Sequence, residues 1–299
     1  MNNGVPAIAD LHMHSVFSDG LNQPTELVKM AAERKLRYIA LTDHDTVAGS
    51  HIYEDAVAEH NLQHPEMKMQ AIRGIELSTG KEGRLHMLGY GVDEDNPVLK
   101  ALIKQNADER IERAEKALAI LPSLGIRLSE ESEMNIRKNH RVGRMQIARA
   151  MMETGVVMSI NEAFTKWLAE GKPAYIPRKT LDPVKAIEII RGANGVAVLA
   201  HPMRIALEDN ARRALIYHLA DNGLQGLEVY HPSAACGYVH QLHAMAKQRN
   251  LLITGGSDYH GDKNSDRQLG CLPEHWQNAE CDVQKLLETI EDSRKNCGM

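Results

Sequence analysis

The chain has 299 residues, of which 43% are hydrophobic and 25% charged, and this composition is typical of a soluble globular protein with a sizeable core. Its net charge of −5 argues against broad nonspecific binding of nucleic acid, although it is compatible with a local basic pocket. Because there is no run of 18 apolar residues, no secretory signal in the first nine residues and no CxxC pair among four cysteines, we expect a cytoplasmic protein without membrane partners.

Seven short apolar runs, continuous rather than alternating, predict buried parallel strands. They lie at 7–11, 38–41, 70–75, 85–92, 196–200, 227–230 and 251–254. Helical patterns occur between several of these runs, at 24–35, 182–191, 210–222 and 234–248. This alternation predicts an α/β protein, either a barrel or an open parallel sheet.

The stretch from residue 96 to residue 172 contains helical patterns only. They lie at 98–121, at 142–153 and from Ser159, which has the capping-box spacing to Glu162. We therefore expect a helical insertion domain of residues 96–172 between the fourth and fifth strands, and a barrel domain formed by residues 1–95 and 173–299.

Histidine and carboxylate side chains occur at or near one end of nearly every predicted strand. In chain order they are Asp10, His12, His14, Asp19, Asp43, His44, Asp45, Glu76, His86, His201, His231, Asp258 and His260. A lone histidine at a strand end is usually a hydrogen-bonded surface residue. The joint pattern is different, because the C-terminal ends of barrel strands form active sites and these groups are ligands for Zn, Mn or Fe.

The motifs around these residues resemble those of the PHP family, named for a domain shared by bacterial DNA polymerases and histidinol phosphatases. The matching segments are Asp10-Leu-His-Met-His-Ser15, Thr42-Asp-His-Asp-Thr46, Gly74-Ile-Glu76, Ala200-His-Pro202 and Gly256-Ser-Asp-Tyr-His260. The resemblance implies a distorted (β/α)7 barrel that holds two or three divalent metal ions, which would be Mn, Fe or Zn.

The resemblance also implies how the ligands divide among the metals. His12, His14 and Asp258 would bind the first metal, Glu76 would bridge it to a second metal bound by His201 and His86, and Asp19, His44 and His260 would hold a third. Asp19 stands where some relatives have histidine, and His86 lies near the start of its predicted strand. Asp43 and Asp45 are interpreted as carboxylates that orient ligand histidines.

The family's subgroup with a helical insertion is similar to this chain, and it implies a phosphatase that removes the 3′-phosphate of nucleoside 3′,5′-bisphosphates. The expected reaction is attack on phosphorus by a metal-bound hydroxide. His231 is either the acid that protonates the leaving alcohol or a hydrogen-bond partner of a ligand. In and just after the insertion, Lys138, Arg144, Tyr175 and Arg178 are expected to bind substrate, and the alternative for these basic residues is a solvated surface.

Three other functions stay open, and so does the oligomeric state. A 5′–3′ exoribonuclease on short RNA could use the same phosphate site. A phosphatase for histidinol phosphate would need no second phosphate site. A degenerate metal-binding module would bind metal without turnover. The sequence favours an enzyme, a phosphoric monoester hydrolase with a small nucleotide as its substrate.

Overall fold

Seven strands form one sheet whose spatial order follows the chain. They are β2 (Ala9–Met13), β3 (Tyr38–Leu41), β4 (Gln70–Thr79), β5 (Leu85–Tyr90), β6 (Val196–Leu199), β7 (Gly226–Tyr230) and β8 (Leu252–Gly255). A parallel bridge between Met13 and Tyr259 brings the two edges of the sheet together, so that the sheet is a nearly closed barrel. Each predicted apolar run forms one strand, and the prediction of a seven-stranded α/β barrel is confirmed.

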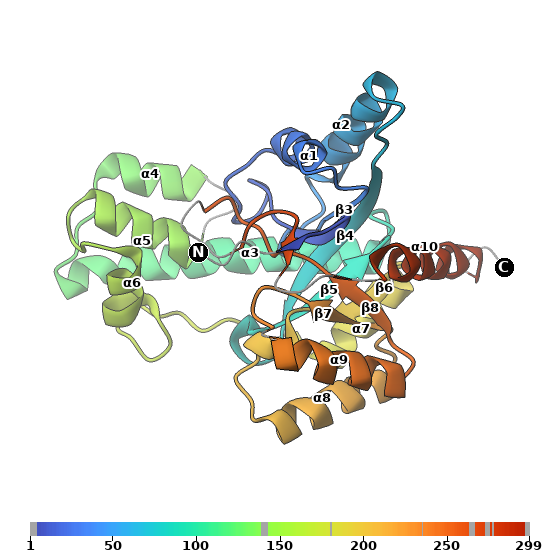
Figure 1. Cartoon of the computed structure of the whole chain (residues 1–299). Coiled ribbons are helices and arrows are strands. Elements are labelled where there is room, and N and C mark those ends of the chain that lie inside the picture. The colour runs from blue at the N-terminus through green and yellow to red at the C-terminus, as the bar shows by residue number, and fades with distance from the viewer. Residues whose placement is uncertain are drawn as a thin grey trace. The chain divides into compact units, whose positions relative to one another are not determined.

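The structure, a computed structural model, describes residues 5–138, 143–179, 181–234, 236–262, 267–272, 276 and 278–296. The chain divides into two units, one formed by residues 1–100 and 180–299 and the other by residues 101–179 (Figure 1). The first unit contains the barrel. A short antiparallel pair, β1 (Val5–Pro6) with β9 (Cys271–Leu272), belongs to the same unit.

Strand β5 runs opposite to both of its neighbours, whereas the other neighbouring strands of the sheet are parallel. The expectation that all strands are parallel is therefore wrong for β5. The reason is the short connection at residues 80–84, which contains one 3₁₀ turn and has no room for the crossover helix that a parallel strand requires. As a result, β5 begins at the barrel end where the parallel strands finish.

Six helices surround the barrel within the described ranges. They are α1 (Pro24–Glu33), α2 (Ser50–Gln63), α7 (Pro183–Gly192), α8 (Asp209–Asp221), α9 (Cys236–Gln248) and α10 (Ala279–Asn296). Helices α1 and α2 lie side by side and share a buried apolar cluster with β2 and β3 (Figure 1). None of the helices in these ranges combines the length and apolar character that crossing a bilayer requires.

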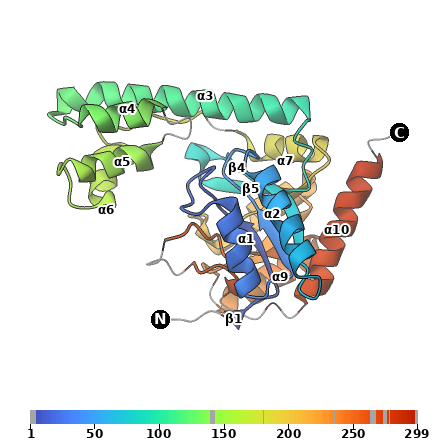
Figure 2. The ribbon, with the colours of Figure 1, turned by 90° about the horizontal axis from the view of Figure 1, so that it is seen from above.

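Helix α10, which was not predicted from the sequence, packs against β2, β6 and β8. Figure 2 shows this helix in red. Near its start it receives a hydrogen bond from Tyr38, the first residue of β3, and Ile290 lies against Gly91, which follows the reversed strand β5. Both contacts lie at the barrel end where the parallel strands begin. Helix α10 therefore covers the end of the barrel opposite to the predicted metal ligands.

The second unit is helical, and its elements pack around one apolar cluster of their own. They are most of α3 (Pro97–Ile120), then α4 (Glu130–Lys138), α5 (Arg144–Glu153), α6 (Ile160–Ala163) and a π-helical turn over Phe164–Leu168. Leu118, Ile136, Ile147 and Met151 contribute to that cluster. The hydroxyl of Ser159 caps α6 by accepting from the backbone N–H of Glu162 at 3.1 Å, as the sequence pattern predicts.

The N-cap of α7 provides a test of how this local sequence stabilises the fold. Asp182 accepts from the backbone N–H groups of Val184 at 2.8 Å and Lys185 at 3.1 Å. Asp182→Ala should lower the free energy of unfolding by about 1 kcal/mol, measured by urea denaturation, because both donors lose their partner. Asp292→Ala, which removes an exposed ion pair with Lys295, is the matched control. It should change the free energy of unfolding by less than about 0.5 kcal/mol. Equal urea midpoints for the two variants would show that the cap contributes nothing.

Candidate metal centre

The buried carboxylate of Glu76, in β4, lies at the middle of the histidine cluster. Its Oε2 atom is 3.3 Å from Nε2 of His12, 3.2 Å from Nε2 of His14 and 3.0 Å from Nδ1 of His44. Among the described residues, this oxygen nevertheless accepts no hydrogen bond. A buried oxygen that is close to three nitrogens without being hydrogen-bonded to them fits a shared cation better than a hydrogen-bond network.

The other oxygen of Glu76 faces a second pair of histidines. Oε1 is 2.8 Å from Nδ1 of His86 and 3.0 Å from Nε2 of His201. His86 reaches this position because β5 is reversed, so that a residue near the start of this strand lies beside residues at the ends of the others. The far nitrogen of His86 lies 3.0 Å from the carbonyl of Gly83, which leaves Nδ1 directed toward Glu76. The two oxygens of Glu76 can therefore bind two different cations.

Asp258, which follows β8, also presents its two oxygens to different partners. Oδ1 lies 3.2 Å from Nε2 of His14 and 3.5 Å from Nε2 of His12. Oδ2 lies 2.9 Å from the guanidinium of Arg204 and 2.6 Å from that of Arg267. One oxygen is thus available to a metal, while two arginines hold the other. Neither arginine was identified from the sequence, since neither lies in a motif at a strand end.

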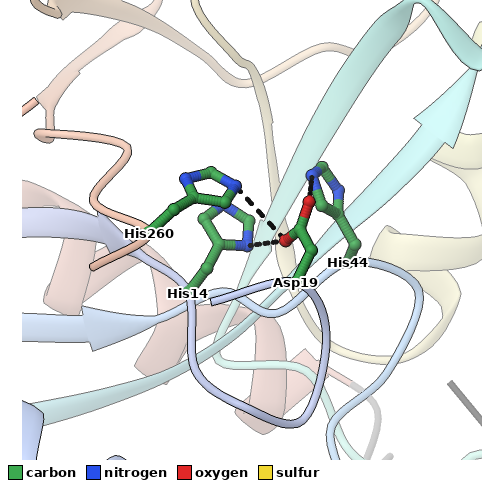
Figure 3. Close-up of side chains that lie close together, drawn as sticks. All are labelled: His14, Asp19, His44 and His260. Carbon is green, nitrogen blue, oxygen red and sulfur yellow. Dashed lines mark ion pairs between the residues drawn. The ribbon is translucent and has the colours of Figure 1, made fainter. Parts of the chain in front are cut away.

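A third group, drawn in Figure 3, consists of His14, Asp19, His44 and His260. The Asp19 carboxylate lies 3.2 Å from Nε2 of His260, 3.8 Å from Nδ1 of His14 and 3.9 Å from Nε2 of His44. The side chain of Asp19 is 42% exposed, whereas Glu76 is fully buried. This group therefore forms the solvent-facing side of the cluster, and it shares His14 and His44 with the group around Glu76.

Burial and neighbouring carboxylates shift the pKa values of the histidines in the cluster in different directions. Burial lowers the pKa of His14, but the neighbouring carboxylates of Asp258 and Glu76 outweigh this effect and raise the pKa to about 10. Burial lowers the pKa of His44 to about 3 and that of His201 to about 4, and both therefore stay neutral at pH 7. Neutral imidazoles beside ionised carboxylates are the form in which these groups bind metal ions.

The main chain is strained at the same place. Asp45, His201 and Asp258 have positive φ angles of 54°, 27° and 53°. Such conformations are costly for residues other than glycine and persist only where surrounding contacts enforce them. His201 and Asp258 are themselves predicted ligands, so that two of these three conformations belong to the metal site.

Close packing of backbone brings β2 and the segment after β8 together beneath the ligands. A Cβ atom on Gly256 would lie 2.3 Å from the Cβ of His12, so that this motif position requires glycine. The buried Asp10 carboxylate accepts from the backbone and hydroxyl of Ser257 at 2.9 and 2.6 Å and from the N–H of Gly270 at 2.7 Å. Asp10 therefore has a structural role, fixing the position of the neighbouring ligands.

Two further carboxylates bind serines. Asp43 accepts from the backbone and hydroxyl of Ser15, each at 2.7 Å, and from the hydroxyl of Ser18 at 2.6 Å. Asp45 accepts from the backbone and hydroxyl of Ser78, each at 3.1 Å. Asp43 anchors the loop after β2, and it reaches a predicted ligand through Ser18, whose hydroxyl lies 3.4 Å from Nδ1 of His14. The orienting role of Asp43 and Asp45 stays a prediction.

His231, at the end of β7, lies beside Asp258, and its ring is 5.3 Å from the ring of His201 in a T-shaped contact. Its Nδ1 accepts from the backbone N–H of Ser233 at 3.0 Å, and its Nε2 lies 3.4 Å from Oδ2 of Asp258. With Nδ1 accepting, the proton belongs on Nε2 and is directed at that carboxylate. This is the geometry of a hydrogen-bond partner of a ligand, and the role of proton donor stays a prediction.

The residues predicted to bind substrate lie in the second unit. Arg144 packs over two aromatic rings, 5.5 Å from the centroid of Tyr175 and 5.8 Å from that of Phe164. Arg178 is partly buried, and the side chain of Lys138 lies outside the described part of the structure. Arg144 and Tyr175 therefore lie together, and the substrate-binding role of all four residues stays a prediction.

Comparison with known proteins agrees with these motifs. The PHP domain matches residues 10–214. The 3′,5′-nucleoside bisphosphate phosphatase of Chromobacterium violaceum is 33% identical over 264 residues, which cover 87% of this chain and 90% of that protein. The 5′-3′ exoribonuclease Rnm of Escherichia coli is 32% identical over 254 residues, which cover 85% of each chain.

A solved structure also matches along the length of the chain. A protein from Bifidobacterium adolescentis assigned as a metal-dependent phosphoesterase superposes with a TM-score of 0.79 at 28% identity, covering 96% of this chain and 98% of that one. From the family match and the identity to these relatives, this chain belongs to the PHP domain family.

Proposed function

We propose that this metal-dependent phosphoesterase removes the 3′-phosphate from nucleoside 3′,5′-bisphosphates. The proposal rests on one combination of contacts. Histidines lie at both oxygens of Glu76, and two arginines contact the neighbouring ligand Asp258. Cationic side chains next to a metal cluster favour an anionic substrate that reacts at the metals. The phosphatase of Chromobacterium violaceum, at 33% identity, supports the choice of a bisphosphate.

The ligand assignment follows the three groups of side chains. His12, His14 and Asp258 would hold one metal, Glu76 would bridge it to a second held by His86 and His201, and Asp19, His44 and His260 would hold a third. When bound, such metals supply a water that loses its proton near neutral pH and neutralise charge on the phosphoryl oxygens. The complete set of donors argues against a degenerate module without turnover.

Arg204 and Arg267 would hold the phosphate that is cleaved. The side chain of Arg204 is 43% exposed, and its guanidinium lies 2.9 Å from Oδ2 of Asp258. A guanidinium that is anchored on one side and open on another can donate to phosphoryl oxygens in a fixed orientation. His231 lies beside the same carboxylate. As an imidazolium, with Nδ1–H donating to the Ser233 hydroxyl at 2.8 Å, it would transfer the proton of Nε2 to the leaving 3′-oxygen as the P–O bond breaks and become a neutral imidazole.

The second phosphate of the substrate needs cations of its own. Arg144, Arg178 and Lys138 are proposed to bind it, with Tyr175 packed against Arg144. Binding energy from a phosphate that does not react positions the one that does. This arrangement would favour a bisphosphate over histidinol phosphate, which has a single phosphate.

A 5′–3′ exoribonuclease is the second candidate, because the relative from Escherichia coli with that name is 32% identical over a similar span. Such an enzyme would use the same cations for a terminal 5′-phosphate and cleave a diester. Activity on short 5′-phosphorylated RNA, compared with adenosine 3′,5′-bisphosphate under identical conditions, separates the two. Greater kcat/KM on the RNA would overturn the bisphosphate proposal and retain the metal centre.

The bridging role of Glu76 can be tested by removing it. Glu76→Ala should lose bound metal, measured by elemental analysis, and its kcat/KM should fall by more than about 100-fold, since even outer partners of metal ligands cost 10- to 100-fold. Glu288→Gln, on the exposed face of α10 at the other end of the barrel, removes the same charge and should keep both metal and activity. Full activity in Glu76→Ala would disprove the bridging role.

The two sets of arginines should respond differently to substrate. Arg178→Ala should lower kcat/KM about 10- to 100-fold on adenosine 3′,5′-bisphosphate, since a charge-assisted hydrogen bond contributes about 1.5–3 kcal/mol, and far less on adenosine 3′-monophosphate. Arg144→Ala should show the same selectivity, although it also loses its aromatic packing. Arg127→Ala, an exposed arginine of the same unit, is the control and should have little effect on either substrate.

Arg204→Ala should instead lose activity on both substrates to a similar extent, because each contains the phosphate that is cleaved. The measurement is kcat/KM for each variant on both nucleotides. Equal losses in Arg178→Ala on the two substrates would exclude the second phosphate site. A wild-type preference for the monophosphate would overturn the bisphosphate assignment itself.

A further inference from the structure

Glu228, in β7, is a carboxylate that none of the metal groups includes, and it is 0% exposed. Its Oε1 atom lies 2.9 Å from Nδ1 of His12. Its Oε2 atom accepts the backbone N–H of His201 at 2.6 Å. One buried side chain thus contacts two predicted metal ligands, one from β2 and one from the end of β6. These two ligands face different oxygens of Glu76.

The contact with His12 fixes which ring nitrogen can bind a metal. A carboxylate at Nδ1 holds the ring N–H on that nitrogen, so that the lone pair is on Nε2. Nε2 is the atom that lies 3.3 Å from Oε2 of Glu76 and 3.5 Å from Oδ1 of Asp258. Glu228 therefore directs the lone pair of His12 toward the other ligands of its group.

The contact with His201 acts on the main chain. His201 has a φ angle of 27°, which lies outside the favoured regions for a residue with a side chain. The hydrogen bond from its N–H to Glu228 helps to hold this conformation, in which Nε2 of His201 lies 3.0 Å from Oε1 of Glu76. Without that acceptor, the strained turn loses one of the contacts that keeps the imidazole directed at Glu76.

We propose that Glu228 is a positioning residue that couples the two metal subsites on either side of Glu76. It directs His12 into one subsite and His201 into the other, so that a change at Glu228 weakens metal binding at both. The inference rests on the ligand assignment of the proposed function, but it does not depend on which phosphate ester is the substrate. A carboxylate that served stability alone would leave metal affinity and ligand geometry unchanged.

Glu228→Gln is the informative substitution, because it keeps the shape of the side chain and replaces one oxygen by an NH₂ group. Whichever way the amide turns, a donor faces either His12 or the N–H of His201. If it faces His12, the ring must accept at Nδ1 and carry its proton on Nε2, where it blocks a metal. If it faces His201, the strained backbone loses its acceptor. Glu228→Asp, which is too short to reach both partners, is the second variant.

The experiment loads the metal-depleted full chain with Co²⁺ and measures binding by calorimetry and the visible absorption spectrum per bound ion. In Glu228→Gln we expect dissociation constants about 10- to 100-fold higher and an altered spectrum, as for other outer partners of ligating histidines. Glu228→Asp should also weaken binding, and it replaces Glu228→Gln as the test if that protein does not fold. Glu288→Gln, the exposed control, should behave as wild type.

The possible outcomes separate this inference from the proposed function. Wild-type affinity and spectrum in Glu228→Gln or Glu228→Asp would overturn the positioning role, even if the thermal midpoint of the variant fell. A wild-type chain that binds Co²⁺ but does not hydrolyse the bisphosphate would refute the proposed function and leave the role of Glu228 standing. A wild-type chain that binds no Co²⁺ would overturn both.

Discussion

The fully buried carboxylate of Glu76 lies between two sets of imidazole nitrogens, and this placement sets the charge balance of the whole barrel end. An ionised carboxylate in a protein interior is stable only next to positive charge. The five histidines around it come from β2, from β5 and from the ends of β3 and β6. Bringing them together requires a nearly closed sheet, a reversed β5 and a glycine at position 256 that lets the chain after β8 approach His12.

Much of this arrangement could be predicted from local sequence. Continuous apolar runs identified all seven strands, because a strand that is buried on both faces is apolar at successive positions rather than at alternate ones. Strand direction could not be predicted in this way, because direction depends on the connections rather than on the composition of a strand. His86 illustrates the difference: its position at the start of β5 counted against it until the reversal of β5 placed it beside Glu76.

The residues that sequence reasoning missed are those whose partners are far away in the chain. Glu228 is one acidic residue within an apolar strand, and its partner His12 is 216 positions away. Arg204 and Arg267 are likewise distant in sequence, and both contact Asp258. Helix α2 was missed because its apolar residues do not gather on one face, so that the helical period gave no signal. The partners of Asp43 were also missed, because Ser15 and Ser18 are far from it in the sequence.

The division of the chain into two units has a consequence for how such proteins diversify. Every predicted metal ligand lies outside residues 101–179, and the segment leaves the barrel through α3 and returns before α7. Selection can therefore alter or exchange this segment without disturbing the reactive groups, since a site grafted on a fold changes through its appended parts. Relatives called a bisphosphate phosphatase and an exoribonuclease are each about a third identical to this chain.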